Sequence, residues 1–276
     1  MNKHFEAYLS ASFDRFKEST IKEAMCYAMD GGKRFRPEII FAIVKGFGLA
    51  EELAYPSAAA LEYIQTYSLI HDDLPAMDND DFRRGKPSLH KAFREDIAIL
   101  TGDALLTHSF EIIAACKEYD DQTKVLLIKD LAAYAGMDGM IYGQLLDVTA
   151  AAQDFNYNEL LAIQDNKTAA LFKYCALAAS HIAKCEDEEY FKKLGQQLGL
   201  IFQNQDDLFD IIKSEKELGK TNSDVRNNKL TALHFFSVDE LKAHIADQFA
   251  QLDAYLAEAP FATQYLKEII ERMRNR

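Results

Sequence analysis

The chain has 276 residues, 49% of them apolar, which is enough for a large core near the upper size limit of one domain. Its 44 Asp and Glu residues outnumber its 31 Lys and Arg residues, which leaves a formal net charge of −13. This balance argues against a nucleic-acid surface, which needs clustered positive charge, whereas small anionic substrates stay compatible where local cations or metal ions reverse the sign.

Targeting and redox features are weak. The N-terminal segment is interrupted by charge at Lys3 and Glu6, which is not the pattern of a signal peptide. No apolar stretch approaches the about 20 residues that a membrane span requires. The four cysteines, at positions 26, 116, 175 and 185, lack C-x-x-C or paired-finger spacing, so we interpret them as reduced core residues. These features predict a cytoplasmic protein with no membrane span.

The overall pattern is helical. Apolar residues recur at helical spacing, and no segment shows sustained apolar/polar alternation. Residues 88–259 contain no proline and little glycine. We therefore predict an all-α fold of long helices, with residues 1–276 as a single domain and short loops near residues 31–37, 82–87 and 216–228.

The first predicted element is an N-terminal helix with one apolar face formed by Phe5, Leu9, Phe13 and Phe16.

The predicted loop at residues 31–37 combines Gly31 and Gly32 with the cations Lys33, Arg34 and Arg36. Glycines let a backbone approach a ligand, and the three cations are suited to hold a diphosphate. Taken alone, the segment reads more easily as an ordinary basic loop.

A first acidic cluster lies at the end of the next predicted helix. Leu61, Ile64, Ser68 and Asp72 fit one helical stripe, so Asp72 should project from the end of that helix. Pro75 then bends or ends the helix, which would bring Asp78 back toward Asp72 and Asp73. The basic pair Arg83 and Arg84 follows directly.

Two smaller patterns precede the second cluster. Gly136, Met140, Gly143, Gln144 and Asp147 form a small and polar helical stripe, for which close helix packing is at least as good an explanation as a direct role. A Lys-Thr pair at residues 167–168 sits inside a helical pattern and means little without further context.

The second acidic cluster lies on a predicted helix whose apolar face includes Leu194, Leu198, Ile201, Leu208 and Ile212. Its polar stripe has the spacing i, i+3, i+4, i+7 and consists of Gln203, Asp206, Asp207 and Asp210.

The two clusters together favour metal binding. Two carboxylates about 4 Å apart repel by roughly 4 kcal/mol at an effective dielectric of about 20, so concentrated sets need cations. All-oxygen ligands with room for water favour Mg²⁺ shared with substrate phosphates. A solvated acidic face is the ordinary alternative, but both clusters are embedded among apolar residues. The basic segments supply the positive charge that an acidic protein needs to hold a polyphosphate.

The motif Asp-Asp-x4-Asp followed by Arg-Arg-Gly, with a later Phe-Gln-x2-Asp-Asp-x2-Asp, resembles the short-chain trans-polyprenyl diphosphate synthases. The run from Tyr67 to Pro87 is especially similar to the bacterial farnesyl diphosphate synthases, and the resemblance extends from about residue 20 to the end. It implies an isoprenoid synthase-type bundle around a deep central cavity, usually a homodimer. The implied reaction condenses isopentenyl diphosphate with dimethylallyl or geranyl diphosphate to give farnesyl diphosphate.

The resemblance also implies residue roles. Three Mg²⁺ ions, for which Mn²⁺ can substitute, would be bound by Asp72, Asp78 and Asp206, with support from Asp73, Asp207 and Asp210. Isopentenyl diphosphate would be held by Lys33, Arg36 and Arg84, with Gln65 where the bacterial enzymes usually carry His. The allylic diphosphate would be held by Arg83, Lys167 and Lys220, and Thr168 and Gln203 would face the developing carbocation.

Product length would be limited by Tyr67, which lies about one turn before Asp72 and is large enough to form a floor under the growing tail, whereas Ser68 leaves the upper cavity open.

The sequence departs from the family at other positions too. Residues 164–166 are Gln-Asp-Asn where the family tends to have His-Arg-His, the loop at 220–224 is one residue short, and Ala232 replaces a usual Tyr. These changes concern substrate affinity and loop closure rather than the metal ligands.

Three alternatives stay open. One is a geranylgeranyl or geranyl diphosphate synthase, and another is a catalytically weak or regulatory prenyl synthase subunit. A class I terpene cyclase would share the first cluster, but its second metal motif normally mixes Asn or Asp with Ser or Thr and Glu. The pure aspartate motif at residues 206–210 favours the transferase.

Overall fold

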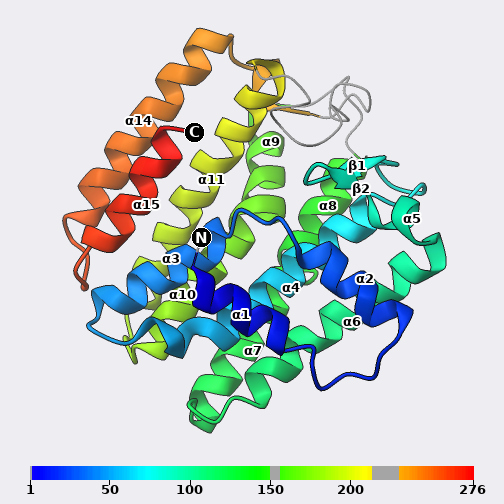
Figure 1. The fold of residues 1–276 in the computed structure, drawn as a ribbon. Helices are drawn as coiled ribbons and strands as arrows, with labels where there is room; N and C mark the ends of the chain where they lie inside the picture. Colours follow the sequence, from blue (N-terminus) through cyan, green and yellow to red (C-terminus); the bar gives the residue numbers. More distant parts are fainter. Residues whose placement is uncertain (1, 150–155, 213–229) are drawn as a thin grey trace.

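The computed structural model describes residues 2–149, 156–212 and 230–276, and the fold is an assembly of helices with one small hairpin (Figure 1). The first half contains α1 (Lys3–Ala11), α2 (Thr20–Met29), α3 (Phe35–Gly46), η1 (Glu51–Ala54), α4 (Tyr55–Asp72), β1 (Phe82–Arg83), β2 (Lys86–Pro87), α5 (Leu89–Ala92), α6 (Glu95–Ala114) and α7 (Asp121–Ala135). The second half contains α8 (Met140–Thr149), α9 (Tyr157–Gln164), the π-helical turn η2 (Asp165–Ala169), α10 (Ala170–Ile182), α11 (Glu188–Ile212), η3 (Ala232–His234), α14 (Val238–Leu256) and α15 (Gln264–Arg274).

The predicted all-α class is confirmed, and local signals explain where several helices begin. The Asn2 side chain accepts hydrogen bonds from the amides of His4 and Phe5 at the start of α1. Reciprocal capping boxes start α9, from Asn156, and α14, from Ser237. Pro56 lies in the first turn of α4, where its missing N–H costs no helical hydrogen bond.

The core is built around α4 and α10. Helix α4 packs against α6, and α10 packs against α3, α7 and α11. Nearly every residue of α10 is buried, and α4 buries large side chains such as Leu61, Tyr63 and Ile64. Full burial of one such side chain contributes roughly 1.5–3 kcal/mol. Figure 1 shows α14 and α15 beside α11, at the opposite side of the fold from the β1–β2 hairpin.

Some predicted boundaries and faces were wrong. Helix α1 ends at Ala11, so Phe13 and Phe16 lie in the following turn, although Phe13 is still buried. Ile212 is 50% exposed at the end of α11 rather than part of its apolar face.

Two of the predicted loops are more regular than expected, and the third lies outside the described residues. Helix α3 begins at Phe35 and takes Pro37 into its first turns, and residues 82–87 form the antiparallel hairpin of β1 and β2. Residues 216–228 are not described.

Two further predictions need correction. All four cysteines are free, but only Cys116 and Cys175 are buried, whereas Cys26 is exposed. In the described part of the chain, one helix, α6, is long and apolar enough by length and composition to cross a membrane. Its buried residues pack in the fold, with α4 as its main neighbour, and core helices of this kind pass the same test.

Candidate functional site

The first acidic cluster closes on itself as predicted. Helix α4 ends at Asp72, the chain turns at Pro75, and the Asp78 amide donates a hydrogen bond to the Asp72 carbonyl oxygen at 2.8 Å. The side chains of Asp72 and Asp78 are half-buried. The turn after the helix therefore returns the third aspartate of the motif, Asp78, to the first, Asp72.

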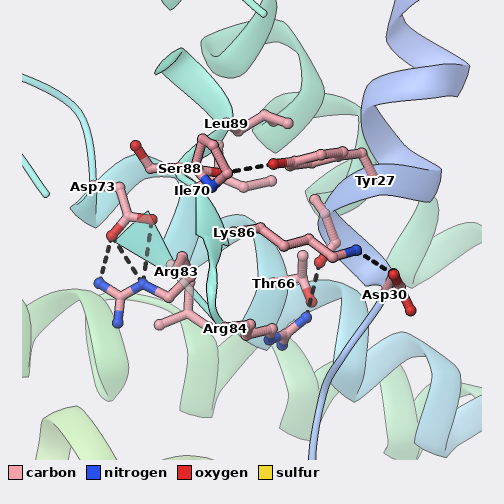
Figure 2. A pocket seen from close by; sticks show the side chains of 13 residues that line it. Tyr27, Asp30, Thr66, Ile70, Asp73, Arg83, Arg84, Lys86, Ser88 and Leu89 are labelled. Carbon is pink, nitrogen blue, oxygen red and sulfur yellow. Dashed lines mark hydrogen bonds and ion pairs between the residues drawn. The ribbon is translucent and has the colours of Figure 1, made fainter. Parts of the chain in front are cut away.

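Asp73 has a different environment from Asp72. It is 2% exposed, and both its oxygens accept hydrogen bonds from Arg83 Nε, at 3.0 and 3.2 Å. Arg83 also contacts Asp80 at 3.1 Å. Burial raises the pKa of Asp73 to about 6, against the lowering effect of Arg83. Asp73, predicted as a supporting metal ligand, thus forms an ion pair with Arg83 in this structure, as Figure 2 shows.

The hairpin is fastened to α2. Lys86 forms an ion pair with Asp30, and Tyr27 donates a hydrogen bond to the Pro87 carbonyl at 2.9 Å (Figure 2). Arg84 has a φ of 54° and donates to the Ala28 carbonyl at 2.8 Å. Its guanidinium also lies near Gly32, where an added Cβ would be 3.4 Å from Arg84 Cζ. The hairpin therefore brings Arg84 to the predicted basic segment.

The basic segment does not present all three of its cations. Gly31 and Arg34 have φ values of 83° and 55°, and this turn directs Arg34 into the core. Arg34 is 5% exposed and forms ion pairs with Glu6 at 2.8 Å and Glu62 at 2.6 Å. The prediction that Arg34 helps to hold a diphosphate was therefore wrong, whereas Lys33 is exposed at the surface of the segment.

Arg36 is held by aromatic rings. Its guanidinium lies 4.6 Å from the Phe172 ring centroid and 5.5 Å from that of Phe202. Among the described residues, its buried Nε has no hydrogen-bond partner. Burial lowers the pKa of this guanidinium, which nevertheless stays a cation at neutral pH. Arg36 was predicted from its sequence motif, whereas the two rings that contact it come from other helices and were not predicted.

Lys167 and Thr168 lie in the π-helical turn η2, not within a continuous α-helix. Lys167 Nζ donates to Asp147 at 2.5 Å, and Thr168 donates to the Gln203 side chain. π-helical turns occur frequently at functional sites because they re-aim side chains within a helix. Gln203 in turn donates to Asp207 Oδ1 at 2.7 Å, so η2 and α11 are joined by side-chain hydrogen bonds.

The second cluster divides into one accessible and two buried carboxylates. Asp206 is half-buried, and one of its oxygens accepts a hydrogen bond from Arg276 at 2.8 Å. Asp207 and Asp210 are 5% and 7% exposed. Asp207 accepts the Ala232 amide at 2.8 Å, so the position where the family has Tyr contributes its backbone instead.

The polar side chains of the three residues before Lys167 all have partners within the fold. Gln164 is buried and donates to Asn204 at 3.1 Å, and Asp165 forms an ion pair with Lys173 at 2.7 Å. Asn166 donates to the Ala162 carbonyl at 2.8 Å. The Gln-Asp-Asn sequence therefore stabilises the turn that carries Lys167.

The remaining predicted residues lie on α4 or outside the described chain. Tyr67 is 6% exposed, and its ring lies 5.8 Å from that of His71. Ser68 is half-buried and donates to the carbonyl of Gln65, itself half-buried, at 3.1 Å. Lys220 and the loop at 220–224 lie outside the described residues.

Arg276 lies at the second acidic cluster but was not among the residues predicted from the sequence. Its guanidinium lies 4.3 Å from the Phe202 ring centroid, on a ring that Arg36 also contacts, and it pairs with Asp206. No spacing pattern pointed to it, because its contacts join residues 70 positions apart.

The donor set fits Mg²⁺. Asp72 and Asp78 offer hard oxygen ligands at the end of α4, and Asp206 offers another on α11. Within residues 2–149, 156–212 and 230–276, no three His, Cys, Asp or Glu side chains form a closed metal site. Mg²⁺ is usually bound through one or two carboxylates plus substrate phosphates and water, so the arrangement suits ions completed by a diphosphate.

Comparison with known proteins identifies the family. The sequence pattern of the polyprenyl synthetase family matches residues 18–273. The farnesyl diphosphate synthase of Bacillus subtilis (strain 168) is 39% identical over 246 residues, covering 87% of this chain and 81% of the relative. The chloroplastic geranylgeranyl pyrophosphate synthase of Catharanthus roseus is 41% identical over 246 residues, covering 84% of this chain and 69% of the relative. A solved structure of a geranyltransferase from Helicobacter pylori, complexed with magnesium and isoprenyl diphosphate, superposes with a TM-score of 0.88 at 28% identity. The match covers 99% of this chain and 96% of that chain.

Proposed function

Because the chain belongs to the polyprenyl synthetase family, we infer that it is a trans-prenyltransferase, and we propose farnesyl diphosphate as its product. The proposed substrates are isopentenyl diphosphate and dimethylallyl or geranyl diphosphate. The supporting observation is that hydrogen bonds connect both acidic clusters to α8 and η2. Gln144 of α8 contacts Asp72 at 2.8 Å, and Asp147, one turn later, contacts Lys167. Thr168, next to Lys167, donates a hydrogen bond to Gln203, and Gln203 donates one to Asp207.

The proposed chemistry is ionisation of the allylic diphosphate followed by head-to-tail coupling. When bound, Mg²⁺ supplies Lewis-acid stabilisation to the departing diphosphate, and we propose three ions, with Mn²⁺ able to substitute. Asp72, Asp78 and Asp206 would hold these ions. Lys167 and Arg83 would bind the allylic diphosphate, with Lys220 as a further proposed contact outside the described residues. These cations oppose the charge that develops on the leaving group.

The second substrate, isopentenyl diphosphate, would bind at the basic residues and not at the aspartates. Lys33, Arg36 and Arg84 would hold isopentenyl diphosphate, with Gln65 as a neutral hydrogen-bonding neighbour. The side-chain oxygens of Thr168 and Gln203 would face the carbocation, and apolar walls would keep water from quenching it. The departing diphosphate can take the proton that coupling releases, so no side-chain base is required.

The test of this proposal is direct. Purified protein is incubated with Mg²⁺, isopentenyl diphosphate and dimethylallyl diphosphate, and the dephosphorylated products are separated by chromatography. A fifteen-carbon alcohol is expected. A twenty-carbon product would favour the geranylgeranyl alternative, to which the similarity with the Catharanthus roseus enzyme also points. Cyclic products would favour the terpene cyclase, and no product under any condition would favour a regulatory subunit.

We also propose that the protein is a cytoplasmic homodimer. Its cysteines are all free, as in reducing compartments. Apolar side chains are exposed on two helices that adjoin the end of α4, namely Ile99 and Leu100 on α6 and Ile141, Leu145 and Val148 on α8. Exposed apolar patches of this kind often form subunit contacts. Sedimentation at assay concentration would detect the dimer, and a monomeric species there would refute it.

A further inference from the structure

Helix α8 contacts the first acidic cluster through one side chain. Gln144 is half-buried, and its Nε2 donates a hydrogen bond to Asp72 Oδ1 at 2.8 Å. Its Oε1 is buried and has no partner in the described part of the chain. Burying the Gln144 Oε1 without a hydrogen-bond partner costs free energy of folding. The hydrogen bond from Gln144 Nε2 to Asp72 is the contact that explains why a glutamine stands at this position.

One turn further along α8, Asp147 contacts the allylic side of the site. Its side chain is 6% exposed and accepts a hydrogen bond from Lys167 Nζ at 2.5 Å. A buried carboxylate beside an ammonium group fixes both the position and the charge of that group. Gln144 and Asp147 are three positions apart, so they share one face of the helix.

The register of this face is set by Gly143. A Cβ at Gly143 would lie 2.1 Å from Lys167 N and 2.5 Å from Lys167 Cα, so α8 approaches the backbone of η2 as only glycine allows. The backbone of η2 is therefore packed directly on the helix that carries Gln144 and Asp147. The contacts of these two side chains reach from Asp72 to Lys167.

We propose that Gln144 and Asp147 are positioning residues for prenyl transfer, Gln144 acting through Asp72 on the metal site and Asp147 acting through Lys167 on the allylic diphosphate. The inference rests on the proposed function and deepens it. Gln144 orients the carboxylate of Asp72 and adds no charge. A glutamate at this position would add a negative charge beside the metal site. Asp147 fixes the position of the Lys167 ammonium group through their ion pair.

The experiment separates the two roles by measuring binding without turnover. Titration calorimetry gives the affinity for Mg²⁺ in the presence of geranyl thiolodiphosphate, an unreactive analogue, and the affinity for that analogue at saturating Mg²⁺. Gln144→Leu is expected to weaken Mg²⁺ binding by about tenfold, the usual size for loss of a residue that orients a metal ligand. Asp147→Asn is expected to weaken analogue binding by about fivefold, because the amide accepts the Lys167 hydrogen bond without the charge.

Matched controls make the same chemical changes elsewhere. Gln122→Leu and Asp138→Asn alter exposed residues and are expected to leave both affinities unchanged. Asp147→Ala removes the acceptor as well and should exceed Asp147→Asn. Should Gln144→Leu unfold the chain, Gln144→Met tests the same contact with an unbranched side chain. All variants should keep the wild-type affinity for isopentenyl diphosphate.

Two results would overturn the proposal: unchanged affinities in both variants, or equal loss of all three affinities in each, which marks a general structural defect. Failure of the proposed function looks different. In that case the wild-type protein binds Mg²⁺ and the analogue but forms no prenyl product, while the variant affinities still report on the two positions. A wild-type enzyme that makes product, with variants that bind as it does, rejects the positioning roles alone.

Discussion

Neighbouring residues of the same type have different environments in this site. Arg34 and Arg36 lie two positions apart, yet Arg34 pairs with Glu6 and Glu62 in the core, whereas Arg36 stacks on Phe172. The sequence predicted the cationic character of the segment correctly. It did not separate the two roles, because the partner Glu62 comes from another helix and the positive φ of Arg34 is a property of the folded turn.

At this scale, Tyr67 is the residue that we expect to limit product length. Its ring is buried one turn before Asp72, and its hydroxyl has no hydrogen-bond partner among the described residues. Burial, with the nearby charge of Asp72, raises the pKa of Tyr67 to about 12, so the ring stays neutral. Tyr67→Ala should therefore lengthen the product from fifteen toward twenty carbons, as chromatography of the dephosphorylated products would measure.

A matched change clarifies the result. Tyr63→Phe on the same helix keeps an aromatic ring at a fully buried position and should leave the product distribution unchanged. If Tyr67→Ala makes the same products as the wild-type enzyme, the floor of the cavity lies elsewhere, and Tyr67 is an ordinary core aromatic.

At the scale of elements, local signals predicted the helices better than their interruptions. The return of Asp78 to Asp72 followed from Pro75, because the cause lies within the same seven residues. The π-helical turn η2 was missed, since the apolar spacing around Lys167 continues without a break. The turn lies in close contact with Gly143 on another helix, and no local pattern records that contact. The end of α1 at Ala11 was missed for a similar reason: buried Phe13 lies beside Tyr63 of α4.

The packing of α6 against this N-terminal turn gives a pH-dependent prediction. His108 is 4% exposed and stacks on Tyr63, with ring centroids 5.1 Å apart. Burial lowers its pKa from the ordinary 6.5, although Glu111 opposes the shift. Well above pH 6.5 the His108 ring is neutral in both the folded and the unfolded chain. Below it, the unfolded chain takes up a proton first, so the free energy of unfolding falls as pH falls toward the folded pKa.

Urea unfolding at about pH 7.5 and about pH 5.5, which bracket the ordinary histidine pKa, measures this effect. His108→Phe keeps a ring in the cluster and removes the titration, so it should lose less stability on acidification than the wild-type protein. His4→Gln, at an exposed position, should behave as the wild type does. A loss in His108→Phe equal to that of the wild type would assign the acid sensitivity to other groups.

At the scale of the whole molecule, the site depends on contacts between distant segments. Phe202 of α11 contacts both Arg36, from α3, and Arg276, which follows α15. The sequence predicted the aspartates on α4 and α11 from their spacing within each helix. It did not predict the pairing of Arg276 with Asp206, because that contact depends on how α15 packs against α3.

The two acidic clusters lie on separate helices, so ligand binding should stabilise the entire fold. A diphosphate with bound metal would join Asp72 and Asp78, at the end of α4, to Asp206 on α11, and in doing so it would replace the ion pair between Asp206 and Arg276. We expect Mg²⁺ and geranyl thiolodiphosphate together to raise the unfolding temperature more than the sum of their separate effects. A ligand present at about 100 times its dissociation constant adds about 2.7 kcal/mol, a shift that a thermal melt resolves easily.

Removing either half of the site should abolish this cooperation. Asp72→Ala and Asp206→Ala are expected to fold, to lose the joint stabilisation, and to lower turnover by at least about a thousandfold, a barrier increase of about 4 kcal/mol. Excess chelator should do the same to the wild-type enzyme. Glu18→Ala removes a charge at a side chain 84% exposed and should change neither property. Full activity in chelator, or undiminished joint stabilisation in Asp206→Ala, would refute metal bridging between the two helices.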